Sequence, residues 1–226
     1  MRPCGVGWCT LLSSTRKGKQ VEQVKKNVSA TSRTRSIAFV GLTVAIMAVS
    51  AWVTVPLGPV PFTLQMFAIT FAIVMLSPKE CMAAIVLYLA LGALGAPVFS
   101  GMSGGIAKLM GPTGGFLWGY IFGVAAAVGL LYLLRRHMGL NAGAIKDAVE
   151  SQRGVAEFLK NASAEIAAGL VFTAVAYFCG WLQLMLVMGL SPEAAFLTGI
   201  APFVVVDVLK VLAAVACARA VKAAVR

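Results

Sequence analysis

Residues 166–189 read IAAGLVFTAVAYFCGWLQLMLVMG, a run of 24 residues without a charged side chain. About 20 apolar residues span the hydrocarbon core of a bilayer as a helix, so this run predicts a transmembrane helix. The rest of the chain agrees, because 60% of its 226 residues are hydrophobic and 12% are charged. A soluble domain carries about 25% charged residues. The composition therefore predicts an integral membrane protein and excludes an intrinsically disordered chain.

Five more apolar stretches lie between turn signals elsewhere in the chain. Together they predict an all-α membrane bundle of six transmembrane helices, near residues 36–55, 62–76, 81–97, 113–134, 166–189 and 193–217. The second and third stretches are short and are interrupted by Pro61, Pro78 and Pro97. Short, proline-interrupted segments in a membrane protein tend to line a cavity rather than face lipid.

The cations are distributed unequally between the two faces that six spans create. The chain has 19 Lys and Arg residues and a net charge of +11. Seventeen of the 19 lie in the N-terminal tail, the 77–80 turn, the 135–165 loop and the C-terminus, which share one face. Lys108 lies on the opposite face, and Lys210 lies within the last span. The positive-inside rule therefore predicts cytoplasmic termini and a multi-pass protein of the cell membrane, and the scatter of the cations argues against nucleic-acid binding.

Three regions are predicted along the chain. Residues 1–35 are a basic polar tail that is disordered or lies outside the core, residues 36–217 form the membrane domain, and residues 218–226 form a cytoplasmic C-terminal tail. The tail lacks the apolar stretch of a secretory signal, whereas an organelle transit peptide and an upstream start codon both fit its composition. The five cysteines form no metal-ligand pattern, so no metal site is predicted.

Two connections on the predicted external face are rich in proline and glycine. The first runs from Pro56 to Gln65, and the second runs from Pro97 to Gly115 and contains six glycines. Glycine lets a backbone pass close to a ligand or to another chain. The flanking prolines and aromatic residues favour an ordered loop that covers a ligand, and the alternative is a mobile surface loop.

Enzymatic activity is disfavoured by the arrangement of the reactive side chains. Residues 101–105 fit the G-x-S-x-G pattern of a serine nucleophile, but Ser103 needs a nearby base. The one histidine, His137, lies on the opposite face of the membrane, so no catalytic residues are predicted. The chain also has no G-x-x-x-x-G-K-[ST] phosphate-binding loop, so uphill transport requires a partner or an ion gradient.

Asp207 and Lys210 are the charged residues placed well inside a predicted span. Buried charges in a membrane are costly and are functional by default, and two residues three apart share one face of a helix. We expect them to face a polar ligand cavity, with Asp207 accepting from N–H donors and Lys210 donating to an oxygen. The alternative is an internal ion pair that only fixes helix packing.

Small residues recur at four- and three-residue spacing on the first predicted helix, at Gly41, Ala45 and Ala48. Small residues at such spacing allow another helix to approach closely. The helix that approaches belongs either to the same bundle or to a partner subunit.

Three segments and the charged pair together resemble a known family. They are Pro59–Gln65 (PVPFTLQ), residues 88–105 with YLALG, GAPVF and SGG, and Gly111–Phe116 (GPTGGF), followed by Asp207-x-x-Lys210. In this order they are similar to BioY, the biotin-binding S component of energy-coupling-factor (ECF) transporters. The resemblance covers residues 36–217, and it departs from the family at Val206, where members often have glycine.

The resemblance implies a substrate-binding subunit that captures biotin on the external face and delivers it inward. It also implies an ECF transmembrane coupling subunit and two cytosolic ATP-binding subunits as partners, with the coupling subunit contacting Gly41, Ala45 and Ala48. Biotin is then the transported ligand, and no cofactor is expected. The alternative is an ATP-independent carrier for another small vitamin or carboxylate metabolite, whereas a purely structural subunit would leave Asp207 and Lys210 without a task.

Biotin's chemistry assigns roles to the candidate residues. The ureido ring, with two N–H donors and one carbonyl, suits Asp207 with Lys210 or Gln65, and the carboxylate suits Lys108 or backbone N–H groups of the glycine-rich loop. The thioether ring needs an apolar aromatic wall. The remaining predicted contacts are Phe62, Thr63, Tyr88, Phe99, Ser103, Gly104, Thr113, Gly114 and Phe116.

Overall fold

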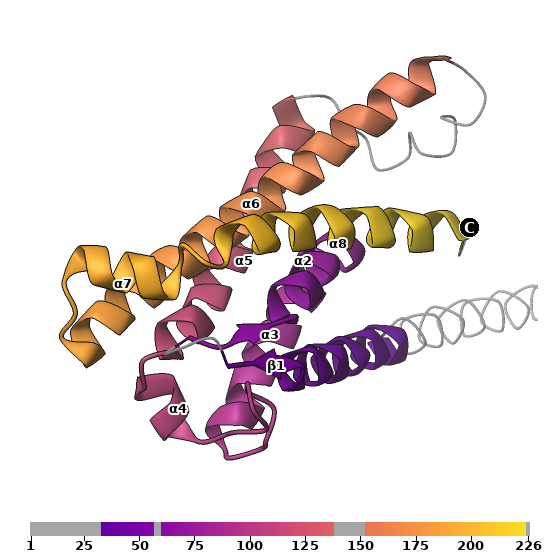
Figure 1. Ribbon diagram of the computed structural model, residues 1–226. Coiled ribbons are helices and arrows are strands. Elements are labelled where there is room, and N and C mark those ends of the chain that lie inside the picture. The colour runs from indigo at the N-terminus through magenta and orange to yellow at the C-terminus, as the bar shows by residue number, and fades with distance from the viewer. Residues whose placement is uncertain (1–32, 57–59, 138–151, 225–226) are drawn as a thin grey trace, which may run out of the picture. The chain divides into compact units, whose positions relative to one another are not determined.

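The computed structural model describes residues 33–56, 60–137 and 152–224 (Figure 1). The described chain is mostly helical. Its elements are a helix at Arg33–Trp52, β1 (Thr54–Val55), β2 (Phe62–Thr63), α2 (Gln65–Met75), α3 (Pro78–Ala93), α4 (Ile106–Met110), α5 (Gly114–His137), α6 (Gln152–Met188), α7 (Pro192–Gly199) and α8 (Val204–Ala224).

Two units are distinguished by internal contacts, Met1–Phe39 and Val40–Arg226. In the first unit, the described helix begins at Arg33. The guanidinium of Arg35 lies 5.4 Å from the ring centroid of Phe39. The predicted tail, residues 1–35, lies almost wholly outside the described residues, so its boundary stays a prediction.

Local sequence signals explain where α3 and α7 begin. Ser77 and Glu80 form a capping box, with 2.7 Å between the Ser77 Oγ and a Glu80 carboxylate oxygen, and Pro78 occupies the first helical position. The α7 helix repeats this start, because the Ser191 hydroxyl accepts from the Ala194 N–H at 3.3 Å and Pro192 follows the cap. The helix start predicted around Glu193 is therefore confirmed.

Helices lie in all six stretches where spans are predicted, which confirms an all-α membrane bundle. Within the described residues, three helices are long and apolar enough to cross a bilayer, namely Arg33–Trp52, Gly114–Leu134 and Ala162–Met188, and α7 with α8 makes a fourth if the bent pair is one span. The α2 helix has 11 residues, or about 16 Å of rise, which is shorter than a bilayer core. The count of six spans therefore stays a prediction.

Several helix boundaries differ from the sequence expectation. The α6 helix begins at Gln152 rather than near residue 166, and α3 covers Pro78–Ala93 rather than 81–97. The helix expected from residue 62 begins at Gln65, because Phe62 and Thr63 pair with Val55 and Thr54 in an antiparallel ribbon. The single helix expected over 193–217 is two helices that meet at a 47° bend. Pro202 explains the break, since proline lacks the N–H and its ring clashes with the carbonyl four residues earlier.

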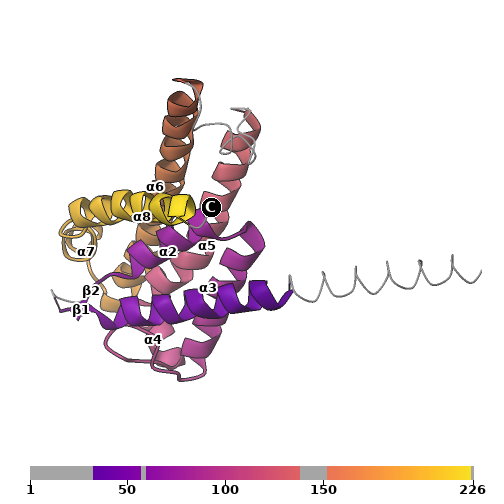
Figure 2. The same ribbon diagram turned by 90° about the vertical axis from the view of Figure 1, so that its right-hand side faces the viewer.

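A row of glycines on α5 sets how closely α5 and α6 approach. Figure 2 shows these two helices running side by side. A Cβ atom on Gly115 would lie 2.4 Å from the Cys179 carbonyl oxygen, and one on Gly119 would lie 2.7 Å from the Cα of Ala176. Glycine at these positions therefore permits a backbone-to-backbone contact, as in small-residue seams of other membrane helices.

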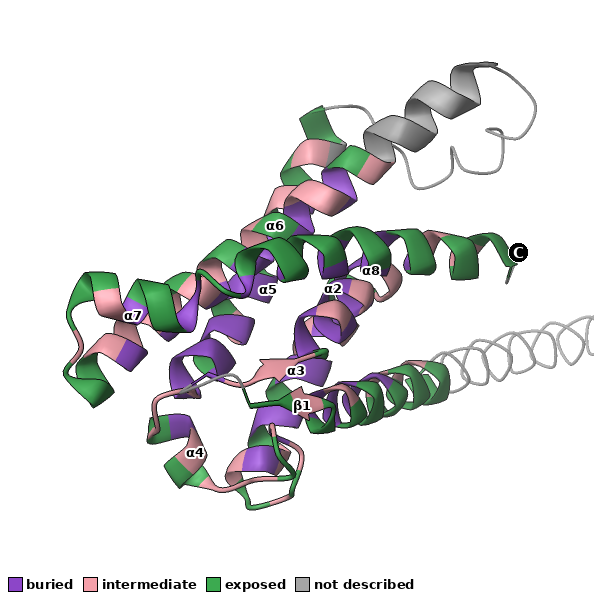
Figure 3. Ribbon diagram, viewed as in Figure 1, coloured by how far each residue is buried: buried purple, intermediate pink, exposed green. Residues whose placement is uncertain are grey.

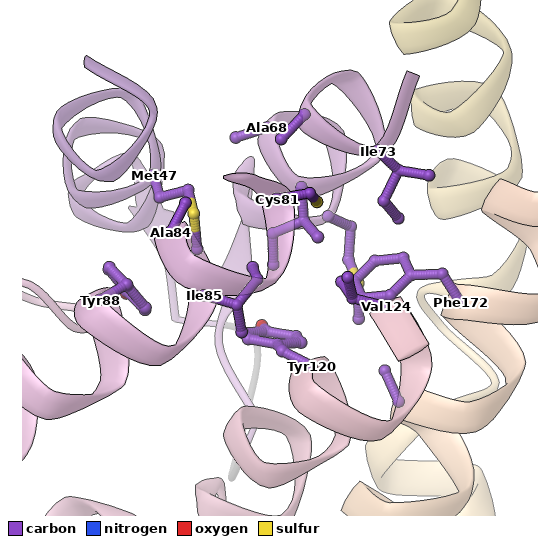
Figure 4. Close-up of a cluster of buried hydrophobic side chains, with 14 of the residues drawn as sticks. Met47, Ala68, Ile73, Cys81, Ala84, Ile85, Tyr88, Tyr120, Val124 and Phe172 are labelled. Atoms are coloured by element: carbon purple, nitrogen blue, oxygen red, sulfur yellow. The ribbon is translucent and has the colours of Figure 1, made fainter. Parts of the chain in front are cut away.

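The main core lies where α2, α3, α5 and α6 meet the helix that ends at Trp52. Figure 4 shows part of this cluster, including Met47, Ile85, Tyr120 and Phe172. Many large apolar side chains are exposed along the helices, among them Phe178, Leu186, Val205 and Leu209. Figure 3 shows in green the exposed segments of α6 and α8. An apolar exterior of this extent is expected of a protein whose solvent is lipid.

Candidate ligand-binding site

The ends of several helices enclose a cavity of about 60 Å³ beside β2. Its wall comes from β2, α2, α5, α6 and α8, together with the loop after α3. Among its lining residues are Phe62, Thr63, Gln65, Phe99, Thr113, Phe116, Tyr120, Tyr177, Phe203, Asp207 and Lys210.

A buried ion pair forms the polar end of this cavity. The Nζ of Lys210 donates to the Asp207 Oδ1 at 2.6 Å and to the backbone carbonyl of Thr63 at 2.7 Å. The hydroxyl of Tyr177 donates to the other Asp207 oxygen at 2.5 Å. The pair therefore joins α8 to both α6 and β2.

The surroundings of the pair compensate two charges that are almost fully buried, Asp207 at 4% exposure and Lys210 at 7%. Asp207 lies in the first turn of α8, where the helix dipole favours negative charge. Lys210 lies over the ring of Phe62, with its Nζ 3.7 Å from the centroid, which is a cation–π contact. The break between α7 and α8 thus places the carboxylate at a helix start rather than in the middle of a helix.

A second hydrogen-bonded chain passes through Gln65, the first residue of α2. The Tyr120 hydroxyl donates to the Gln65 Oε1 at 3.3 Å, and the Gln65 Nε2 donates to the Tyr88 hydroxyl at 2.6 Å. Tyr88 then donates to the Val98 carbonyl at 2.7 Å. This chain orients the Gln65 amide, and an amide nitrogen has a second N–H to offer.

Aromatic rings line the remainder of the cavity. Phe62 stacks on Phe203 with 6.5 Å between ring centroids, and Phe116 meets Tyr177 edge-on at 6.3 Å. Phe99 is fully buried and also lines the cavity. Such walls accept the flat apolar faces of a small ring system, while the polar end fixes its orientation.

Many of the predicted site residues meet at this cavity. Asp207, Lys210, Gln65, Thr63, Phe62, Phe99, Thr113 and Phe116 are among its lining residues. Tyr88 is fully buried behind Gln65.

Four predicted contacts lie outside the cavity wall. The Ser103 hydroxyl donates to the Ser100 carbonyl at 2.7 Å, and Lys108 belongs to α4. Gly104 and Gly114 pack against backbone, since a Cβ atom would lie 2.3 Å from the Ala96 oxygen and 1.8 Å from the Leu109 oxygen, respectively. Their contact with a ligand stays a prediction.

The three predicted partner-contact residues separate into two groups. Gly41 and Ala45 are exposed, and a Cβ atom on Gly41 would have no neighbour within 4 Å. Ala48 is 7% exposed and belongs to the main core. Gly41 and Ala45 thus remain available to another helix, whereas Ala48 serves packing within the bundle.

Sequence reasoning missed Tyr120, Tyr177 and Phe203 as members of the site. Each is an aromatic residue within an apolar stretch, and such residues usually pack in a core or face lipid. One signal was available for the tyrosines, because a phenol hydroxyl buried in a membrane span needs a hydrogen-bond partner. No group of three His, Cys, Asp or Glu side chains that could hold a metal occurs in the described part of the chain.

The fold and the cavity define a class of protein: a helical membrane protein with a small, aromatic-walled site that holds a buried ion pair. Residues 21–226 match the family model described as the BioY family. The chain belongs to the BioY family. This is a family of transporter components, which confirms the predictions that the chain is not an enzyme and that it takes no cofactor.

Individual relatives agree with this family assignment. The chain is 34% identical over 183 residues to a protein of Pyrococcus horikoshii described as a probable biotin transporter BioY, covering 81% of this chain and 93% of the relative. It is 45% identical over 97 residues to the biotin transporter BioY of Thermotoga maritima, covering 43% and 57%, respectively. Its fold is similar to a crystal structure of the S component for biotin from an ECF-type ABC transporter, with a TM-score of 0.68, 22% identity, and coverage of 85% and 93%.

Proposed function

We propose that this chain binds biotin in the cavity beside β2 and carries it inward across the cell membrane. The observation that supports this most is the buried pair of Lys210 and Asp207, hydrogen-bonded to the half-buried Tyr177 and facing an aromatic wall beside Gln65. The ion pair that only fixes helix packing is the alternative, but such a pair would not need to line a cavity. The BioY relatives described as biotin transporters support the choice of ligand.

In the proposed pose, the ureido ring of biotin meets the polar end of the cavity. An ionised carboxylate has about four acceptor positions, and Asp207 uses two of them for Lys210 and Tyr177. Asp207 can therefore also accept a ureido N–H, while Lys210 or Gln65 donates to the ureido carbonyl. The thioether ring then lies against Phe62 and the other aromatic side chains.

The carboxylate tail of biotin points toward the glycine-rich loop in this pose. Thr113 lines the cavity on that side, and Lys108, Ser103, Gly104 and Gly114 belong to the same loop region. Pockets for small molecules measure about 300–1,000 Å³, so we expect the 60 Å³ cavity to widen when biotin enters. The β1–β2 ribbon, which carries Thr63, is the segment we expect to move.

Transport is proposed to require an ECF coupling subunit and two cytosolic ATP-binding subunits. The sequence has no phosphate-binding loop of its own. Gly41 and Ala45 offer an exposed small-residue surface for a partner helix.

The ligand is tested by calorimetric titration of the detergent-purified protein with biotin and a panel of other vitamins. We expect biotin alone to bind tightly, and Asp207→Asn and Lys210→Met each to weaken it by about a hundredfold, because each leaves a buried charge without its partner. Parent-like affinity in both variants would show the pose to be wrong, and preference for another vitamin would show the proposed ligand to be wrong.

The partners are tested separately by uptake of radiolabelled biotin in cells with and without the coupling subunit and the ATPases. Uptake that depends on them is expected. Equal uptake in their absence would instead support the ATP-independent carrier.

A further inference from the structure

Gln183 of α6 is a polar residue outside the cavity, in an apolar groove between α5 and α6. The groove is lined by side chains that include Met110, Trp118, Phe122, Leu182 and Leu186. An amide in an apolar groove is costly unless it is hydrogen-bonded. The Gln183 Nε2 donates to two backbone oxygens, those of Leu109 and Gly111, each at 2.9 Å.

These two oxygens lie at the end of α4. The last carbonyls of a helix have no partner within the helix, so the Gln183 amide caps α4 from a neighbouring element. The contact between Gln183 and residues 114–115 is closely packed. A Cβ atom on Gly114 would lie 2.7 Å from the Gln183 Nε2, and one on Gly115 would lie 2.7 Å from the Gln183 Cβ. Glycine at 114 and 115 therefore allows this backbone to lie directly against the Gln183 side chain.

The residues on either side of Gly114 and Gly115 belong to the cavity wall. Thr113 and Phe116 both line the cavity, and they flank the two glycines that pack against Gln183. The start of the same loop is held elsewhere, because the Trp52 indole donates to the Pro97 carbonyl at 2.7 Å. The loop is thus attached to one helix near its beginning and to α6 near its end.

We infer that Gln183 is a positioning residue for the ligand site: its amide holds residues 111–115 in place and so keeps Thr113 and Phe116 against the bound ligand. This inference rests on the proposed function for the identity of that ligand. Because the amide secures a segment whose neighbours Thr113 and Phe116 form part of the cavity wall, its loss is expected to speed ligand escape more than ligand entry.

Two variants and a matched control test this role. Gln183→Met keeps the length of the side chain without its donors, and Gln183→Glu places an acceptor against two carbonyl oxygens. Leu186→Ala alters the same groove at a side chain that is 76% exposed. In binding kinetics with biotin, both Gln183 variants should raise the dissociation rate by about tenfold, the factor that one net hydrogen bond supplies, while the association rate and the control stay near the parent. An unchanged dissociation rate, or an equal rise in Leu186→Ala, would overturn the inference.

A measurement without ligand separates this inference from the proposed function. Hydrogen exchange of peptides covering residues 109–115 should be faster in Gln183→Met than in the parent and in Leu186→Ala, at an unchanged midpoint of thermal unfolding. If the parent binds no biotin but exchange still rises, the proposed ligand is wrong and the attachment by Gln183 stands. Exchange equal to the parent's would overturn the attachment itself.

Discussion

Asp207 is held by two side chains, Lys210 of its own helix α8 and Tyr177 of α6, and it lies in the first turn of α8. Removing one member of a buried charged group leaves the others without compensation, so single changes cost more than the lost contact. Tyr177 is the member that can be altered most gently, since phenylalanine keeps its ring against Phe116 and removes one donor.

Tyr177→Phe should weaken biotin binding by about tenfold, because a hydrogen bond to a charged group contributes about 1.5–3 kcal/mol and Asp207 would turn away from the ligand to regain a donor. Titration calorimetry measures the change. Tyr132→Phe is the matched control, since Tyr132 is 66% exposed and lies outside the cavity wall. Equal affinities in Tyr177→Phe and the parent would mean that the hydroxyl has no part in binding.

Lys108 carries a separate prediction, because it lies in α4 and outside the cavity wall. If it attracts the carboxylate of biotin, Lys108→Gln should weaken biotin much more than an uncharged biotin amide. Parallel titrations with the two ligands measure the difference. Similar losses of affinity for both ligands would mean that Lys108 does not bind the carboxylate of biotin.

Helix types and helix positions were largely predictable, whereas helix interruptions were only partly so. Long apolar stretches specify a membrane helix by composition alone, and Ser77 and Ser191 mark helix starts through local hydrogen bonds. The bend before Val204 was missed because Pro202 lies in an otherwise uninterrupted apolar stretch. For the site, Asp207 and Lys210 stand out as charges, but Tyr120 and Tyr177 depend on which helix faces meet, and that is a property of the packed bundle.

The α5–α6 seam yields a stability prediction. Gly119→Ala places a methyl group 2.7 Å from the Ala176 Cα, so the helices must separate, at a cost of about 1–3 kcal/mol. Gly129→Ala is the matched control on the same helix, because a Cβ atom there would meet nothing within 4 Å. Thermal unfolding in detergent should show a lower midpoint for Gly119→Ala, and a midpoint at or above the parent's for Gly129→Ala, since alanine is the better helix former. If the midpoints of both variants equalled the parent's, α5 and α6 would be less closely packed at Gly119 than in the structure, and the prediction would be wrong.

The cations predict the orientation of the molecule as a whole, because 17 of the 19 lie on segments expected to face the cytoplasm. Lys108 and Lys222 belong to opposite faces in this arrangement, and both lie in described helices, α4 and α8.

Labelling of single cysteines in intact cells tests the orientation. In a variant without the five native cysteines, Lys108→Cys should react with a membrane-impermeant maleimide, whereas Lys222→Cys should react only after the cells are permeabilised. Reaction of both residues in intact cells, or of Lys222→Cys alone, would refute the proposed topology.

The polar end of the cavity has a further consequence for selectivity. Lys210, Asp207, Tyr177 and Gln65 all have hydrogen-bond partners inside the protein. A ligand that displaces any of these contacts exchanges one hydrogen bond for another and gains little from it. A ligand that displaces them without an equivalent donor or acceptor leaves a buried group unsatisfied, at about 1–3 kcal/mol for each. The internal hydrogen bonds therefore compete with those that a ligand forms. They lower the affinity of ligands that match the site imperfectly more than they raise the affinity of the correct ligand.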